Sequence, residues 1–321
     1  MKRRLKRLAV GFAALVGLLL CVGLAWEAFT RGQLVTRFPV PGTLVDVGGH
    51  RLQLDCRGEG EPTVVFESGI DTGGALAWSK VHDAVAKVTR ACAYSRAGLM
   101  WSEPSADVRD AKHIADELHA LLAKAGVARP VVLVGHSLGG VFAMTFTAQY
   151  PEEVAGVVLV DASHPEMKQR MNAAGLELHE PLLPLQIARA LARTGVVRVV
   201  VGDEDAEAAF VPGSLGAMVS EIEAADTSLA QASALRGFGD RPLFVLTAGK
   251  LSDEFAAQAQ LSPQQSAVFQ QQWRKLQDEQ ASWSTRSQHV VVADTAHDIH
   301  RDRPEEVIAA VKWVVAKVRE R

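Results

Sequence analysis

The pattern of apolar and polar residues divides the chain into strands and helices that alternate regularly. Apolar runs that predict strands occur in "PTVVFESG", "RACAYSRAG", "PVVLVGHSLGG", "VAGVVLVDASHPE", "RPLFVLTAGK" and "QHVVVADTAH". Between two of these runs, Trp78, Val81, Val85 and Val88 recur at helical spacing, which predicts a helix with one apolar face. Strands that alternate with helices predict an α/β fold with a mostly parallel sheet flanked by helices.

The two ends of this pattern have their own signals. Residues 43–56, "TLVDVGGHRLQLDC", read as two alternating strands joined by Gly48-Gly49, which predicts a hairpin and an antiparallel edge. A further helical pattern is expected to begin near Val108. In the last helix, Asp302 and Pro304 are expected as N-cap and first residue.

One segment interrupts the alternation. Residues 163–239 are mostly helical in pattern and too long for a simple connection, which predicts a helical cap inserted into a core of residues 32–162 and 240–321. Several apolar cap residues either contact an apolar acyl group or pack within the cap itself. They are Leu182, Leu183, Leu185, Ile187, Phe210 and Met218.

The first 31 residues differ from the rest in composition. Five cations in "MKRRLKR" precede the charge-free run "LAVGFAALVGLLLCVGLAW", residues 8–26, which is about as long as the hydrocarbon layer of a bilayer is thick. Basic residues before such a run favour a cytoplasmic N-terminus and a domain outside the cytoplasm. Residues 1–31 are therefore predicted to form a transmembrane helix that anchors the protein in the cell membrane as a single-pass protein.

Two other interpretations of this segment also export the domain. A cleaved signal peptide, with "GLA" at Gly23–Ala25 as its site, would give a secreted or periplasmic protein. Lipidation at Cys21 is disfavoured because leucine stands directly before the cysteine. Residues 32–321 hold 28 basic and 36 acidic residues, a net charge of −8, and nucleic acid is not expected as a partner.

The segment "VVLVGHSLGG" carries the clearest chemical signal. Its G-x-S-x-G pattern places Ser137 between Gly135 and Gly139, where a buried strand turns into a helix. Such a turn holds the serine hydroxyl outward at the end of the sheet, and the helix N-terminus adds N–H groups that would stabilise an oxyanion. Ser137 is therefore the candidate nucleophile.

The motif "GHSLGG" on this strand order resembles the α/β-hydrolase fold over residues 43–319. The chain is similar in particular to exported or membrane-anchored serine hydrolases of the esterase and lipase type. The segments that carry this resemblance are "VVFESG", "CAYSRAGLMWSEP", "LVGHSLGG", "VVLVDASHPE" and "TAHDIHRDRPEEV". Ser95 replaces the usual aspartate of one turn, and Ala296 replaces the glycine before the histidine, but neither change removes a reacting group.

A serine nucleophile needs a base, and the base needs an orienting acid. The resemblance assigns His297 as the base, with His300 as a neighbour; no metal site is expected, because the pair lacks the glutamate of H-E-x-x-H and a third ligand. The acid is either Asp161, directly after a buried strand, or Asp253, several residues beyond the next strand. Asp161 is favoured because orienting an imidazole requires a rigid position.

The resemblance also implies roles for backbone groups and for two cysteines. Backbone N–H groups of Leu138 and, by alignment of the loop after "VVFES", of Ile70 are expected to form the oxyanion hole. The family strand order puts Cys56 beside Cys92, so a disulfide is expected in an oxidising compartment.

Together these features predict a serine hydrolase without cofactor that cleaves a small carboxylic ester, thioester or lactone through a Ser-His-Asp triad and an acyl-enzyme. An aminopeptidase or an acyltransferase would use the same groups. A non-catalytic, membrane-anchored binding module is the alternative from another class, because a fold does not dictate a function.

Overall fold

An eight-stranded sheet forms the centre of the computed structural model, which describes residues 2–177, 182–235 and 237–320. The strands lie in the order β1-β2-β4-β3-β5-β6-β7-β8. Their bounds are β1 Thr43–Asp46, β2 Arg51–Arg57, β3 Val64–Glu67, β4 Ala91–Ser95, β5 Val131–His136, β6 Val154–Val160, β7 Leu243–Ala248 and β8 Ser287–Val292. Strand β2 is antiparallel to β1 and β4, and all other neighbours are parallel, which confirms the predicted architecture.

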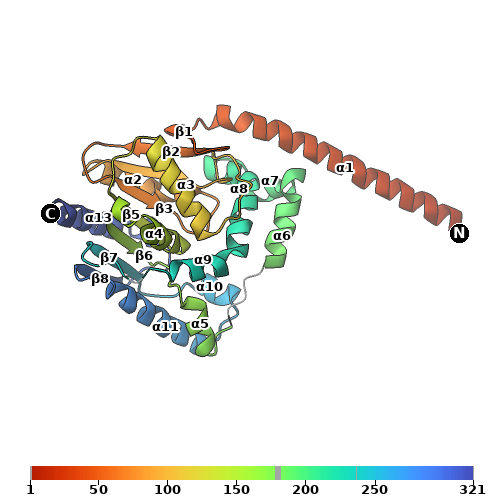
Figure 1. The fold of residues 1–321 in the computed structure, drawn as a ribbon. Helices are drawn as coiled ribbons and strands as arrows, with labels where there is room; N and C mark the ends of the chain where they lie inside the picture. The colour runs from red at the N-terminus through yellow and green to blue at the C-terminus, as the bar shows by residue number, and fades with distance from the viewer. Residues whose placement is uncertain (1, 178–181, 236, 321) are drawn as a thin grey trace.

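Helices cover both faces of this sheet (Figure 1). The helices of the core are α2 Ser79–Ala86, α3 Ala111–Lys124, α4 Leu138–Gln149, α11 Pro263–Ala281, α12 Ile299–Asp302 and α13 Pro304–Arg319. Alternate residues of each strand point to opposite faces. On β5, Leu133 packs in the cluster that includes α3 and α4, whereas Val132 and Val134 pack in the cluster that includes α2 and α13.

The segment 163–239 supplies α5 Met167–Ala173, α6 Leu182–Leu191, α7 Val196–Val201, α8 Ala206–Glu223 and α9 Ala225–Ala232, and α10 Asp253–Gln258 follows β7. Short 3-10 helices occur at η1 Gly74–Trp78, η2 Pro151–Glu153 and η3 Ala192–Thr194. Helices α6, α7 and α8 contact one another, whereas α5 contacts α11 and α9 contacts α3 and α4. The segment therefore consists of an outer group of helices and two helices that pack on the core.

Two helix starts differ from the sequence prediction. The last long helix begins at Pro304 as expected, but its N-cap is Arg303, because Asp302 already ends the short helix α12. Helix α3 begins at Ala111 rather than near Val108, because the Asp110 side chain caps it by accepting a hydrogen bond from the N–H of His113.

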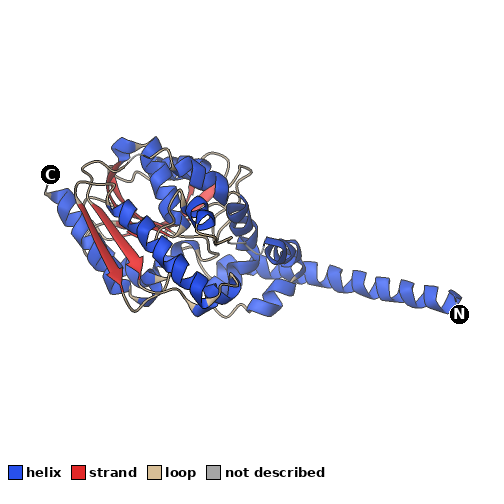
Figure 2. Cartoon of the chain, turned by 90° about the horizontal axis from the view of Figure 1, so that it is seen from below, coloured by secondary structure: helices blue, strands red, loops and turns tan. Residues whose placement is uncertain are grey.

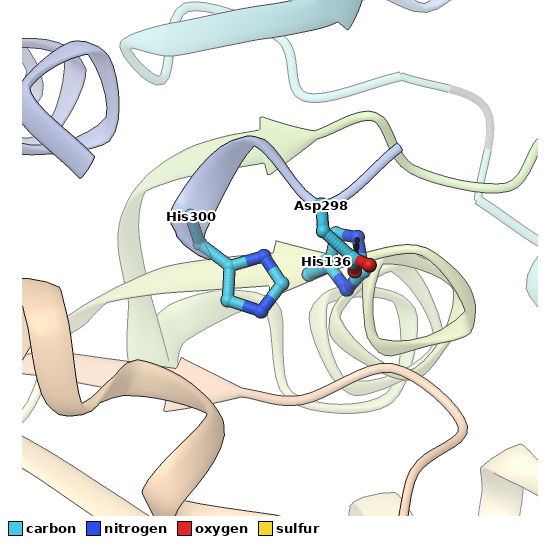
Figure 3. Close-up of side chains that lie close together, drawn as sticks. All are labelled: His136, Asp298 and His300. Atoms are coloured by element: carbon cyan, nitrogen blue, oxygen red, sulfur yellow. Dashed lines mark ion pairs between the residues drawn. The ribbon is translucent and has the colours of Figure 1, made fainter. Parts of the chain in front are cut away.

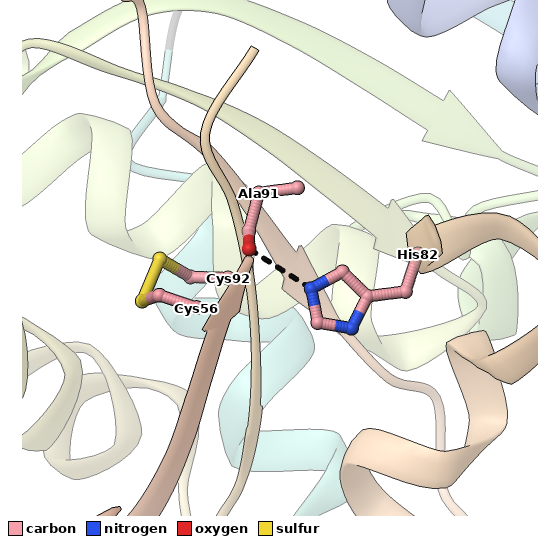
Figure 4. Close-up of a disulfide and its surroundings, with 4 residues drawn as sticks. All are labelled: Cys56, His82, Ala91 and Cys92. Atoms are coloured by element: carbon pink, nitrogen blue, oxygen red, sulfur yellow. Dashed lines mark hydrogen bonds between the residues drawn. A yellow bond between two sulfur atoms is a disulfide. The ribbon is translucent and has the colours of Figure 1, made fainter. Parts of the chain in front are cut away.

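Cys56 and Cys92 lie directly opposite each other on β2 and β4 and are joined by a disulfide (Figure 4). On the other side of β4, the Nε2 atom of His82 lies 2.9 Å from the carbonyl oxygen of Ala91. The disulfide thus links β2, in the antiparallel edge, to β4, which also pairs with the parallel part of the sheet.

The N-terminal helix α1, Lys2–Arg37, projects from the body of the protein as one continuous helix (Figures 1 and 2). Among the described residues it is the one helix long and apolar enough to cross a membrane. Its second half contacts the outer helices, where Glu27 and Leu34 are buried. This helix therefore extends beyond residue 31 and packs on the folded domain.

Candidate active site

Ser137 occupies a strained turn between β5 and α4. Its backbone has φ 54° and ψ −126°, outside the regions that residues with a side chain usually adopt. The turn requires glycines around it: a Cβ on Gly135 would lie 2.7 Å from the carbonyl oxygen of Gly139, and one on Gly139 would lie 2.4 Å from that of Ser68. This is the geometry that presents a serine hydroxyl at the end of a sheet.

His297 lies in the loop after β8 and contacts Asp161, which follows β6. The Nδ1 atom of His297 is 2.6 Å from Oδ2 of Asp161, although the two residues are 136 positions apart. The Asp161 carboxylate is buried, whereas 46% of the His297 side chain is exposed. An acid in this position holds the ring with Nδ1 protonated, so that Nε2 is free to accept a proton.

The other oxygen of Asp161 is held by two further donors. The backbone N–H of Ala248 donates to Oδ1 over 2.9 Å, and the indole N–H of Trp273 on α11 donates over 2.8 Å. Asp161 itself has φ 43°, a left-handed conformation that is uncommon for a residue with a side chain. The sequence analysis missed Trp273, because no local pattern relates it to Asp161.

Asp253 lies elsewhere. It is the first residue of α10, it is exposed, and the cap of that helix is made by the Ser252 side chain. The structure therefore brings His297 together with Asp161, the favoured acid of the sequence analysis.

The pKa of His297 reflects its partners. Burial lowers this pKa, but the hydrogen bond to Asp161 and the charge of Asp161 outweigh the effect, so the pKa lies above the ordinary value of a histidine. A raised pKa makes the ring a stronger base and stabilises the imidazolium that forms when it accepts a proton.

The loop after β3 lies against Ser137. A Cβ on Gly69 would be 3.0 Å from the Cβ of Ser137, so Ile70 follows directly on the residue that contacts the serine. Leu138 is the first residue of α4, where a backbone N–H has no acceptor within its own helix. Of the two positions expected for an oxyanion hole, Leu138 thus follows Ser137 directly in the chain, and Ile70 follows the glycine that packs against Ser137.

A buried ion cluster fixes this loop, and we call Glu67, Arg96 and Glu221 the loop cluster. The Arg96 guanidinium donates to Oε1 of Glu67 and to Oε2 of Glu221, each over 2.7 Å, and all three side chains are almost fully buried. It also donates to the carbonyl oxygens of Ser68 and Gly69, over 2.8 and 2.7 Å. Arg96 therefore holds the loop that packs against Ser137.

The loop cluster contains more acidic than basic groups, because two carboxyl groups share one guanidinium. Burial raises the pKa of Glu67 to about 7, although Arg96 and a hydrogen bond from the Tyr94 hydroxyl act against this. Burial lowers the pKa of Arg96, but the charges of Glu221 and Glu67 raise it by more. The pKa of Arg96 therefore lies above its ordinary value, and the guanidinium stays charged. The sequence analysis quoted the segments that hold Glu67 and Arg96 without assigning either residue a role.

His136, Asp298 and His300 bring their side-chain ligand atoms within 4.8 Å of one another (Figure 3). The Nε2 atom of His136, however, lies 3.0 Å from the carbonyl oxygen of His297, so this nitrogen carries a proton and donates. Burial, with neighbouring histidines, lowers the pKa of His136, and burial lowers that of His300 to about 3. The neutral His136 and His300 rings accordingly support the loop that holds His297.

Three of the apolar cap residues differ in their surroundings. Phe210 packs against Trp101 with ring centroids 5.2 Å apart, so it joins the cap to the core. Leu183 and Ile187 are exposed on α6. Phe210 therefore packs between the cap and the core, whereas Leu183 and Ile187 lie on the surface of the cap.

The geometry of the elbow, with a histidine and a buried acid at the ends of later strands, defines an α/β-hydrolase fold. The model of the alpha/beta hydrolase family matches residues 64–310, and the chain belongs to that family. A curated relative, the uncharacterized protein YbdG of Bacillus subtilis, is 28% identical over 181 residues, which are 55% of this chain and 56% of that protein. The chain thus matches little more than half the length of this relative.

Solved structures share the fold at low sequence identity. An epoxide hydrolase from Bacillus megaterium, solved as a mutant, aligns with a TM-score of 0.64 at 15% identity and covers 85% of this chain and 100% of its own. An esterase from Thermogutta terrifontis aligns with a TM-score of 0.55 at 20% identity, over 86% of this chain and 98% of its own. A haloalkane dehalogenase reconstructed as an ancestor aligns with a TM-score of 0.61 at 16% identity, over 87% and 100%. These neighbours and the family support a hydrolase.

Proposed function

We propose that the protein is a serine hydrolase that cleaves carboxylic esters, including thioesters and lactones, through an acyl-enzyme. The observation that carries the proposal is the contact between His297 and the buried Asp161 at the same end of the sheet as the strained Ser137. A hydroxyl at the elbow forms an acyl ester with a carbonyl substrate, and this intermediate is what a base and an oxyanion hole are suited to make and to hydrolyse.

The steps follow from the positions of these groups. The Oγ atom of Ser137 attacks the acyl carbonyl while Nε2 of His297 takes its proton, and Asp161 stabilises the imidazolium. Backbone N–H groups of Leu138 and Ile70 stabilise the oxyanion of the tetrahedral intermediate. The intermediate collapses, the alcohol leaves with the proton from His297, and a water molecule activated by the same ring then releases the acid.

The proposal includes a membrane anchor that is retained. Helix α1 is unbroken across Gly23–Ala25, the segment considered as a cleavage site, and its contacts with the folded domain begin at Gly23 and continue to Leu34. A Cβ on Gly23 would lie 2.1 Å from the carbonyl oxygen of Thr194, and Glu27 forms a buried ion pair with Arg198. These contacts support an intact helix that holds the domain at the outer membrane surface.

Labelling by a fluorophosphonate, compared in the wild type and in Ser137→Ala, tests the nucleophile. We expect labelled wild-type protein and an unlabelled variant with the same unfolding midpoint. A well-folded wild type that takes no label would favour the non-catalytic binding module, and label that persists in Ser137→Ala would assign the nucleophile elsewhere.

Two matched variants, Asp161→Asn and Asp253→Asn, test the acid with a short p-nitrophenyl ester. Because an amide at 161 favours the wrong tautomer of His297, we expect kcat to fall by about 10⁴ in Asp161→Asn and to stay near the wild-type value in Asp253→Asn. In the wild type kcat/KM should fall as the pH drops through the raised pKa of His297. If Asp253→Asn alone loses activity, the assignment of Asp161 is wrong.

A further inference from the structure

Helix α7 has the reverse of the usual distribution of polar and apolar side chains. Val199 and Val200 are 73% and 79% exposed. Arg198, which directly precedes Val199 in the chain, is only 2% exposed. Arg198 donates two hydrogen bonds of 2.8 Å to the Glu27 carboxylate and one of 2.9 Å to the carbonyl oxygen of Ala209. A helix that buries its charge and exposes its valines is suited to an apolar surrounding.

The neighbouring helix α6 extends this apolar surface. Leu183, Ile187 and Leu191 are exposed and recur every four residues, which places them in one stripe along the helix. Helices α6 and α7 contact each other, and Figure 1 shows both on the side of the body next to α1. We call this surface the cap face: Leu183, Ile187, Leu191, Val196, Val199 and Val200.

The contacts of α1 show where the cap face lies along the axis of α1. The charge-free residues 8–26 span roughly 28 Å at the rise of an α-helix, about the thickness of the hydrocarbon layer. A Cβ on Gly195, directly before α7, would lie 2.7 Å from the Trp26 ring, so α7 begins where this charge-free segment ends. Tryptophan at that end is typical of the boundary between lipid and water.

From these contacts we propose that the cap face lies in the outer surface of the lipid bilayer beside the anchor, and that the enzyme acts on esters whose acyl chains are held in that bilayer. The proposal rests on the retained anchor and on the hydrolase activity proposed above. Burying exposed valine and leucine side chains among acyl chains is favourable, because it removes apolar surface from water. The same outer helices reach the site, because Glu221 of α8 bonds to the Arg96 that holds the loop beside Ser137.

Fluorescence quenching in vesicles tests the location of the cap face. In a Cys21→Ser background of the full chain, single variants Val199→Cys and Ile187→Cys carry a fluorophore, and Ala316→Cys on α13, exposed and at the end of the body away from α6, is the control. The protein is reconstituted into phosphatidylcholine vesicles. We expect nitroxide lipids to quench the fluorophore at 199 and 187 at least threefold more than at 316, and iodide in the water to do the reverse.

Two other results would overturn the proposal. Equal quenching by nitroxide lipids at 199 and 316 would mean that the cap face does not meet the bilayer. Protection from both iodide and nitroxide lipids at 199 would mean that another protein or a second copy covers the face instead.

Activity separates this inference from the proposed function. Val199→Glu should lower the hydrolysis of a long-chain ester within the vesicles at least fivefold, with unchanged hydrolysis of a soluble short ester, whereas Ala316→Glu should change neither. A wild type that hydrolyses neither ester refutes the hydrolase proposal, while lipid quenching at 199 would still support the bilayer contact. If Val199→Glu hydrolyses the embedded ester as fast as the wild type, the proposed substrate class is wrong.

Discussion

Two clusters of charged side chains, each with a buried central residue, hold the outer helices in place, and they balance charge in opposite ways. In the loop cluster, Arg96 lies between Glu67 and Glu221, so two acids share one cation. The anchor cluster consists of Glu27, Arg31 and Arg198, and here two cations share one acid. Helix α8 takes part in both, through the Glu221 side chain and through the carbonyl oxygens of Ala209 and Pro212.

The difference shows that sensitivity to substitution depends on the place of a residue in its cluster. Removing a central residue leaves both of its partners without their counter-charge in a region of low dielectric, which is strongly destabilising. Removing a peripheral residue leaves one balanced ion pair. Arg96 is central in the loop cluster, whereas Arg198 is peripheral in the anchor cluster.

The largest effect is expected for Arg96→Met. This change leaves Glu67 and Glu221 without their cation and the carbonyl groups of Ser68 and Gly69 without a donor. We expect the free energy of unfolding to fall by about 3–5 kcal/mol and ester hydrolysis to fall with it, because the loop beside Ser137 loses its support. Urea unfolding and kcat measure the two effects.

Arg57→Met is the control for this variant, because Arg57 pairs with Asp55 and Asp83 near the surface and is 42% exposed. An exposed pair contributes about 1 kcal/mol or less, so the control should remain close to the wild type. Equal losses in the two variants would remove the distinction between central, buried cations and surface cations.

An effect of intermediate size is expected from Glu67→Gln, and it depends on pH. Folding raises the pKa of Glu67 from 4.5 to about 7, so the folded state binds the extra proton between these values. The contribution of this group is therefore most favourable below pH 4.5 and is lost as the pH rises to about 7. Relative to Glu67→Gln, the wild type should lose on the order of 2–3 kcal/mol across this range.

Urea unfolding of both proteins at pH 5, 6, 7 and 8 checks this prediction, and the difference between them isolates Glu67 from the other titrating groups. A difference that stays constant from pH 5 to pH 8 would contradict the prediction, because it would show that Glu67 is ionised throughout in the folded protein and stabilised by Arg96.

The local pattern of the sequence is sufficient for the sheet and for the elbow but not for these clusters. Buried strands and amphipathic helices are periodic over a few residues, so these elements follow from the sequence, and the resemblance to a known fold implies their order. Arg96 and Glu221, however, are 125 positions apart, and Trp273 is 112 positions from Asp161. Such partners meet only through tertiary packing, so the spacing of residues within a short segment does not predict their contact.

The cap shows the same limit for apolar residues. Leu183 and Phe210 both look like core residues in the sequence, yet Leu183 is exposed and Phe210 is buried against Trp101. Periodicity identifies an apolar face of a helix, but it does not say whether protein or lipid covers that face.

The smallest effect is expected for Arg198→Met, the peripheral cation of the anchor cluster. Glu27 keeps its 2.7 Å hydrogen bond from Arg31, and the methionine fills most of the space of the lost side chain. We expect a loss of about 1–2 kcal/mol, since the remaining pair still compensates the buried carboxylate. Thermal unfolding of the detergent-solubilised chain measures this loss.

Hydrolysis of a soluble short ester should remain within about twofold of the wild type in Arg198→Met, because the loop cluster and the contact between Asp161 and His297 are untouched. Arg37→Met, which removes a surface pair between α1 and Asp203, is the matched control. A loss of activity as large as that in Arg96→Met would mean that α8 transmits the state of the anchor cluster to the loop beside Ser137, so that the two clusters act as one unit.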